Sequence, residues 1–207
     1  MKRQISTGLI AVLALLVVAP AMAQSPKGWL VRVDRSTNAS DPDGAGSVKF
    51  TTTATGFHAV NPQAAVYWDP ANTATGNYSV KGTFTLVRPS SHTNYYGLVF
   101  GGSDLGGAQQ SYLYFMVAQD GSWLLKRRDG TATPDVARGT NAAVKRPDAQ
   151  GKSVNALEVR VSGDKTEYLV NNTIVHTMPK AGMKTDGLYG IRVNHALEVQ
   201  VDGFSKS

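Results

Sequence analysis

The chain has 207 residues, with 21 Lys and Arg against 15 Asp and Glu, and it contains no cysteine. The lack of cysteine excludes disulfides, thiol catalysis, thiolate metal ligands and a lipidated N-terminal cysteine. The net charge of +6 comes from interspersed residues rather than from a basic stripe, so the composition does not indicate a nucleic-acid-binding protein.

Residues 1–23 have the pattern of a secretory signal peptide. A basic pair, Lys2-Arg3, precedes an apolar run at 9–18, and Ala21-Met22-Ala23 fits the small-x-small cleavage rule. The apolar run is shorter than the roughly 20 residues that a membrane span needs. We therefore expect a signal-peptide helix that is cleaved off by a Sec-type pathway. The remainder, 24–207, is then secreted or periplasmic in a bacterium, without a membrane span or a lipid anchor.

From residue 29 onward, short apolar–polar alternations separated by turn residues predict about a dozen strands and no helix. In chain order the expected strands are 29–33, 48–55 with 57–60 continuing it, 65–68, 78–87, 95–101, a hairpin at 112–128, 157–162, 167–170, 173–177, 188–193 and 197–204. Residues 130–152 lack periodicity and are predicted to form a long surface loop or an irregular edge segment. This pattern is typical of an all-β, antiparallel β-sandwich, in a single domain over 24–207.

The hairpin at 112–128 carries the densest group of large side chains. Asp120-Gly121 is a strong signal for a two-residue turn, which pairs Val117 with Leu124. Alternation then assigns one face to the core, with Leu113, Phe115, Val117 and Leu124. The other face carries Tyr112, Tyr114, Met116, Trp123, Leu125 and Arg127.

That second face is the candidate ligand-binding surface, because aromatic rings stack on sugars and a cation binds hydroxyls. Arg192 and Tyr95 are each out of phase with the apolar residues of their own strands, so they are predicted to share it. The expected ligand-binding residues are Tyr95, Tyr112, Tyr114, Trp123, Arg127 and Arg192. The alternative is that these aromatics are half-buried under a covering loop such as 130–152.

Five segments in succession resemble the concanavalin A-like lectin/glucanase superfamily, and especially its secreted laminin-G-like and 3-keto-disaccharide hydrolase domains. They are YYGLVFGG (95–102), SYLYFMVAQDGSW (111–123), NALEVRVSGDKTEYLVNNTIV (155–175), GLYGIRV (187–193) and LEVQVDGF (197–204). The resemblance covers residues 75 to 207. It implies a jelly roll of two curved antiparallel sheets, whose concave sheet commonly binds saccharide and in some members hydrolyses it.

Two carboxylates are needed to cleave a glycosidic bond. The Glu-x-Asp-x-x-Glu motif of family-16 glucanases is absent, and the first glutamate of the chain is Glu158, in a predicted strand. Asp69 and Asp104 remain as weak catalytic candidates, although Asp69-Pro70 is also typical of a turn. Asp120 is explained by turn chemistry.

The four histidines are widely separated and form no zinc motif along the chain. Asp41-Pro42-Asp43-Gly44 places Asp41 and Asp43 in a loop with hard oxygen ligands, which leaves a structural calcium site as one alternative and an ordinary acidic turn as the other. No other cofactor is expected.

Three functions stay open on the sequence alone. The leading hypothesis is a secreted, lectin-like carbohydrate-binding domain without catalysis, which is monomeric and has a saccharide or glycan as its partner. The second is a glycoside hydrolase related to the 3-keto-disaccharide hydrolases. The third is a structural or adhesion module of the cell envelope.

Overall fold

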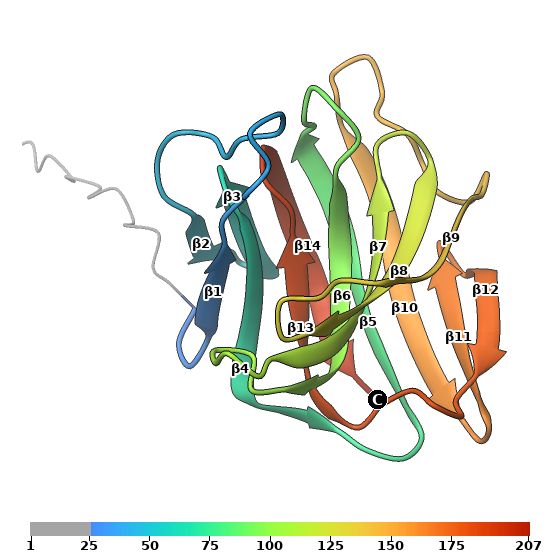
Figure 1. The fold of residues 1–207 in the computed structure, drawn as a ribbon. Coiled ribbons are helices and arrows are strands. Elements are labelled where there is room, and N and C mark those ends of the chain that lie inside the picture. The colour runs from blue at the N-terminus through green and yellow to red at the C-terminus, as the bar shows by residue number, and fades with distance from the viewer. Residues whose placement is uncertain (1–25) are drawn as a thin grey trace, which may run out of the picture.

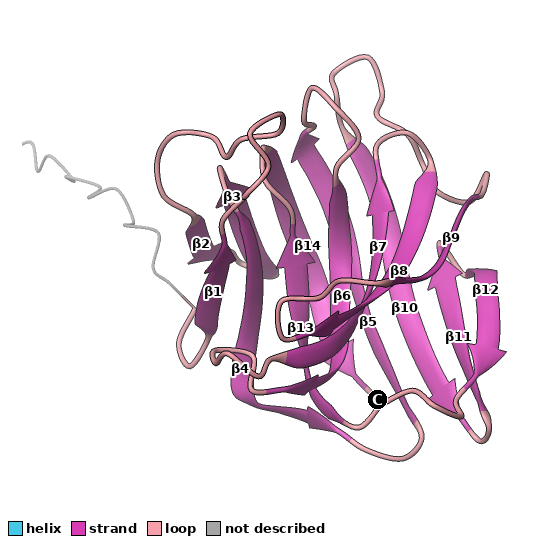
Figure 2. Cartoon of the chain, in the orientation of Figure 1, coloured by secondary structure: helices cyan, strands magenta, loops and turns pink. Residues whose placement is uncertain are grey.

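The computed structural model describes residues 26–207, which form a sandwich of two antiparallel β-sheets (Figure 1). These residues form strands, turns and loops but no helix (Figure 2). Accordingly, no helix within 26–207 could cross a membrane. The predicted all-β antiparallel sandwich is confirmed. The predicted signal peptide, its helix and the cleavage site before Gln24 lie outside the described residues.

Each sheet has seven strands. In spatial order, sheet A consists of β1 (Leu30–Asp34), β4 (Ala64–Ala74), β13 (Gly187–Val193), β6 (Tyr95–Ser103), β7 (Ser111–Ala118), β8 (Ser122–Asp129) and β9 (Asp135–Thr140). Sheet B consists of β12 (Thr173–Pro179), β11 (Lys165–Val170), β10 (Ser153–Ser162), β5 (Tyr78–Arg88), β14 (Leu197–Lys206), β3 (Gly56–Asn61) and β2 (Lys49–Thr52).

The core lies between the sheets and is built by residues at every second position. In β5, Val80, Gly82, Phe84 and Leu86 are buried, and the residues that alternate with them are exposed or half-buried, as the pattern predicts. Phe84 meets Tyr96 of β6 across the sandwich with ring centroids 6.0 Å apart. In contrast, β6 is buried on both of its faces. Something must therefore cover part of the outer face of sheet A as well.

The β7–β8 hairpin has a three-residue loop, 119–121, instead of the predicted two-residue turn. The Gly121 amide donates to the Ala118 carbonyl at 3.2 Å, and Gly121 has a φ of +87°. A type I turn followed by a glycine with positive φ is the usual form of such a loop. Val117 therefore pairs with Trp123. The predicted register is wrong by one residue, and a slip of one residue exchanges the two faces of β8.

Three smaller predictions also need correction. Of the two alternatives for residues 130–152, the surface loop is wrong and the edge segment is partly correct, because 135–140 form β9 at the edge of sheet A; Val144 packs into the core. Residues 57–60 belong to a separate strand, β3, that pairs with β2. β4 does not end at Trp68 but continues through Asp69-Pro70 to Ala74. The pairing of β13 with β4 is irregular at this point, so proline removes no hydrogen bond from a regular ladder.

Candidate functional site

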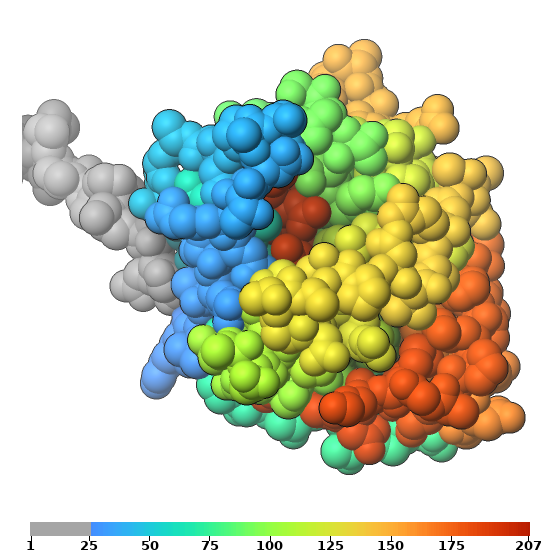
Figure 3. Space-filling view, viewed as in Figure 1, coloured from blue at the N-terminus to red at the C-terminus, as the bar shows by residue number. Residues whose placement is uncertain are grey.

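The outer face of sheet A is hollowed near its middle. Figure 3 shows the depression, with dark red atoms of the C-terminal part of the chain at its bottom. The segments that follow β1, β5 and β8, in blue, green and yellow, surround it. Its volume is about 440 Å³, within the range of small-molecule sites. The lining residues are Asp34, Arg35, Ser36, Thr37, Asn38, Ala64, Tyr95, Tyr114, Met116, Leu124, Lys126, Arg128, Thr133, Arg138, Arg192, Asn194 and His195.

The floor of the hollow is apolar. Tyr114 and Met116 point outward from β7, and Leu124 joins them from β8 because Met116 pairs with Leu124. Beside the floor, residues 104–110 fold over the remainder of this face. Within that segment Leu105 is only 2% exposed and packs in the same outer cluster as the floor residues. The outer face thus has a covered half and an open half.

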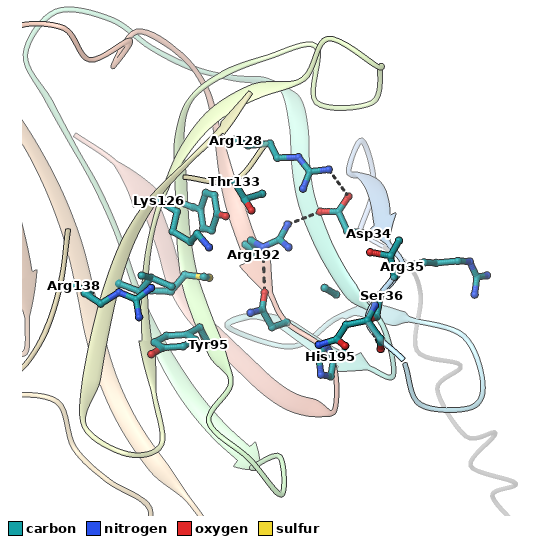
Figure 4. Close-up of a pocket in the computed structure, with 17 residues that line it drawn as sticks. Asp34, Arg35, Ser36, Tyr95, Lys126, Arg128, Thr133, Arg138, Arg192 and His195 are labelled. Atoms are coloured by element: carbon teal, nitrogen blue, oxygen red, sulfur yellow. Dashed lines mark hydrogen bonds and ion pairs between the residues drawn. The ribbon is translucent and has the colours of Figure 1, made fainter. Parts of the chain in front are cut away.

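Arg192 is the central cation of the hollow, and Figure 4 shows it reaching toward Asp34. Its Nη1 donates to Asp34 Oδ2 at 2.6 Å and to the Tyr112 hydroxyl at 3.0 Å, and its Nε donates to Asn194 at 3.2 Å. The guanidinium carbon lies 5.3 Å from the centre of the Tyr114 ring, which is a cation–π contact. Among the described residues Nη2 has no hydrogen-bond partner, so this nitrogen can bind a ligand.

Asp34 is the only carboxylate among the described residues that line the hollow. Besides Arg192 it pairs with Arg32 at 3.1 Å and with Arg128 at 4.0 Å. Burial alone would raise the pKa of Asp34, but the charges of Arg192 and Arg128 and the hydrogen bonds from Arg192 and Arg32 outweigh it and hold this pKa below its ordinary value. Asp34 is therefore a fixed anion that orients the arginines, and it is not available as a general acid.

Replacing Asp34 by asparagine should lower the free energy of unfolding at pH 7 by about 2 kcal/mol, because Arg192 keeps only a neutral acceptor. The pKa of Asp34 is lower in the folded than in the unfolded chain. Its contribution is therefore fully present above the unfolded value of about 3.9 and is lost as the pH falls through the folded value. Urea unfolding of both proteins at pH 7, 5 and 3 should show a difference that shrinks only below about pH 4. A difference that stays constant down to pH 3 would contradict this role.

Three further cations border the hollow from the β8–β9 side. They are Lys126, Arg128 and Arg138, and Figure 4 shows them on one side of the site. Burial, together with the positive charges of Arg138 and Arg192, lowers the pKa of Lys126. Asp135 partly offsets this charge, since it forms ion pairs with Lys126 and Arg138. The site as a whole remains positively charged.

The structure brings three of the six predicted ligand-binding residues to the hollow, Tyr95, Tyr114 and Arg192. A fourth, Tyr112, lies on the predicted face but is 2% exposed under residues 104–110, where it accepts a hydrogen bond from Arg192. The proposed covering of the aromatics is thus partly correct, although 104–110 provides it instead of 130–152.

Trp123 and Arg127 do not lie on this face, and the prediction is wrong for both. Trp123 points into the core, where its ring stacks on His176 with centroids 5.1 Å apart. Arg127 is exposed and borders a different cavity. The cause is the hairpin register, because the three-residue loop turns the odd-numbered residues of β8 away from the hollow. The same change brings in Lys126 and Arg128, which the sequence prediction missed.

The weak catalytic candidates have structural roles. Asp69 Oδ1 accepts the Ala71 amide at 2.9 Å, and Asp104 Oδ2 accepts the Gln109 amide at 2.9 Å. Neither lines the hollow. The calcium candidates also separate: Asp43 accepts the amide of Ser36, whereas Asp41 contacts two histidines.

No protein-family model matches the chain, and a search of curated proteins finds no match. Solved structures are nevertheless similar. The carbohydrate binding module CBM66 from Bacillus subtilis has a TM-score of 0.63 and 12% identity, over 87% of this chain and 95% of that one. The exoplasmic/lumenal domain of VIP36, in a form bound to Ca²⁺ and Man3GlcNAc, has a TM-score of 0.59 and 8% identity, over 84% of this chain and 81% of that one.

A putative glycosyl hydrolase from Parabacteroides distasonis is similar over 76% of this chain and 89% of that one, with a TM-score of 0.52 and 14% identity. At such identities the likeness is one of fold, and it agrees with the strand rhythm and turns of the sequence. The chain has the fold of the concanavalin A-like lectin superfamily.

Proposed function

We propose that this chain is an exported saccharide-binding domain, and that the hollow of sheet A binds an acidic saccharide. The observation that carries the proposal is the combination of an apolar, aromatic floor with a cationic rim in one hollow of about 440 Å³. Sugar rings stack on aromatic faces, while carboxylate or sulfate groups suit arginine and lysine.

The charge balance of the site favours an acidic over a neutral ligand. Five of the lining side chains are cationic, namely Arg35, Lys126, Arg128, Arg138 and Arg192, against the single carboxylate of Asp34. Burial and then the charges of Arg138 and Arg192 lower the pKa of Lys126, and an anionic ligand would offset the repulsion between these cations. The Nη2 of Arg192, which has no hydrogen-bond partner in the described part of the chain, supplies a donor in the same hollow.

The geometry favours binding over hydrolysis. Glycosidases of both stereochemical types use two carboxyl groups, about 5 to 10 Å apart, across the scissile bond. Within the described part of the chain the hollow contains only Asp34, whose oxygens are already held by three arginines. The likeness to a module described as carbohydrate-binding and to the VIP36 exoplasmic/lumenal domain bound to Man3GlcNAc supports saccharide binding.

The signal-peptide pattern of residues 1–23 supports a role outside the cytoplasm, in the periplasm or beyond it. The domain would bind an acidic saccharide there as a monomer, since one hollow on one sheet supplies all the contacts named above.

The test is a titration of the chain with an oligosaccharide of uronic acids and with its carboxyl-reduced counterpart. We expect the acidic form to bind at least tenfold more tightly, which is about 1.4 kcal/mol. Lys126→Met should weaken acidic binding about tenfold and leave neutral binding unchanged. Lys81→Met removes the same charge from the exposed side of β5 in sheet B and should have no effect.

Equal affinity for the acidic and the reduced ligand would contradict the proposed specificity. Equal weakening by Lys81→Met and Lys126→Met would show that only the net charge of the protein matters. If neither ligand binds at millimolar concentration to the folded chain, the saccharide-binding proposal fails.

A further inference from the structure

Three polar side chains converge at one end of the sandwich, at the rim of the hollow, which one of them, His195, also lines. They are Asp41 from the β1–β2 connection, His92 from the β5–β6 connection and His195 from the β13–β14 turn. Figure 1 shows these connections at the same end of the molecule. The ligand atoms of all three lie within 4.8 Å of one another.

The distances within this trio form a nearly equilateral triangle. His195 Nε2 is 3.0 Å from Asp41 Oδ1, His92 Nε2 is 3.1 Å from the same oxygen, and the two Nε2 atoms are 3.2 Å apart. Two ligands bound to one tetrahedral zinc ion, each about 2.0 to 2.1 Å from it, lie about 3.3 Å apart. The triangle therefore has the size that a tetrahedral metal site requires.

Hydrogen bonds account for at most two of the three contacts in the triangle. With Asp41 ionised, its oxygen only accepts, and each ring nitrogen either carries a hydrogen or exposes a lone pair. If both nitrogens carry hydrogens, the contact between His92 and His195 sets two donors against each other. If only one does, the other nitrogen faces the carboxylate with two lone pairs opposed. One cation in contact with all three atoms removes this conflict.

The surroundings of the histidines hold them in the arrangement that binds a metal. Ser90 Oγ lies 3.1 Å from His92 Nδ1, where it can accept that ring hydrogen and leave Nε2 with a lone pair toward the trio. Asn94 Nδ2 donates to the backbone carbonyl of His195 at 2.8 Å and also lies 3.3 Å from His92 Nε2. Asn94 is 4% exposed, so it holds the two connections together from beneath.

We propose that Asp41, His92 and His195 form a site for one divalent transition-metal ion, with zinc as the first candidate. Two imidazoles and one carboxylate favour zinc, copper, nickel or iron over calcium and magnesium, which prefer oxygen ligands. The ion would attach the β1–β2 connection, residues 35–48, to the end of both sheets. The same connection supplies Ser36 to Asn38 of the hollow, so the metal would also fix one rim of the saccharide site.

The test uses the full chain without a histidine tag, freed of metal by a chelator and dialysed against ZnCl₂, then against CaCl₂. We expect one zinc ion per chain, a higher melting temperature with zinc, and no comparable effect of calcium. His92→Gln and His195→Gln should each lower the zinc affinity by more than about tenfold. His58→Gln is the matched control, because His58 contacts Glu198 at 3.1 Å in a pair that no third metal-ligating residue joins within residues 26–207.

Circular dichroism shows whether each variant is folded, and zinc binding is measured without any saccharide. The proposal is therefore tested independently of the function of the hollow. Unchanged zinc affinity in both His92→Gln and His195→Gln would overturn it. So would folded wild-type chain that binds no zinc at about 100 μM, or calcium that raises the melting temperature as much as zinc does.

Discussion

Replacing Arg192 by methionine should abolish acidic-saccharide binding and lower the free energy of unfolding by about 3 kcal/mol. Methionine fills much of the same volume, but Asp34 loses its closest cation and the Tyr112 hydroxyl loses its donor. Asp34 still pairs with Arg32 and Arg128 in this variant. The expected loss of stability is therefore at the lower end of the range for breaking a buried ion pair. Urea unfolding measures the stability, and a saccharide titration of the folded variant measures binding.

Arg88→Met is the control for this experiment. Arg88 is exposed and pairs with Glu198 at 3.5 Å, so its loss should cost less than about 1 kcal/mol and leave binding intact. If Arg192→Met binds the acidic saccharide as the wild type does, then Arg192 is not part of the site. If its stability is unchanged, the buried ion pair with Asp34 does not form in solution.

Trp123→Ala should lower the free energy of unfolding by about 4 kcal/mol, the largest effect of any substitution considered for this hairpin. Its side chain is 6% exposed and packs between the sheets against His176. Arg127→Ala, four residues along the same face of β8, should change stability by less than about 0.5 kcal/mol and leave saccharide binding unchanged, because Arg127 is exposed and outside the hollow.

Together, these two substitutions test the pairing register of the β7–β8 hairpin. With a two-residue turn, Trp123 and Arg127 would both lie on the open face, and their loss would weaken saccharide binding while the fold survived. Thermal and urea unfolding of the two variants, with a saccharide titration of Arg127→Ala, decide between the registers. A stable Trp123→Ala that no longer binds saccharide would contradict the three-residue loop.

The strands could be predicted from the sequence because their signals are local. Alternation along β5 gives both its extent and its buried face, and the continuous apolar run of β6 predicts a strand that is buried on both sides. Arg192 could likewise be assigned to the outer face from its immediate neighbours, Ile191 and Val193, which both lie in the core.

The register of the β7–β8 hairpin was harder to predict from the sequence, because it depends on whether the loop has two or three residues. Asp120-Gly121 is compatible with a two-residue turn and with the last two positions of a three-residue loop. The choice exchanges Trp123, Leu125 and Arg127 for Leu124, Lys126 and Arg128 on the open face. Side-chain polarity could not decide the register either. Leu125 lies in the core, but its neighbour Leu124 is equally apolar, so the sequence does not show which of the two faces inward.

The clusters that join distant parts of the chain could not be predicted from local patterns. Asp34 and Arg192 are 158 residues apart and meet because β1 and β13 both pair with β4. His92 and His195 meet because β6 and β13 are neighbours, with Tyr96 opposite Val193. Which strands become neighbours depends on the order of the whole sheet, and strand signals alone do not specify that order.

Chemical-shift mapping by NMR tests the central claim most directly. A titration of the isotopically labelled chain with an acidic oligosaccharide should shift the signals of Tyr114, Lys126 and Arg192, which line the hollow of sheet A. The outer face of sheet B, with Lys81 and Glu158, should be unaffected. Shifts confined to sheet B, with none around the hollow, would contradict the assignment of the binding site.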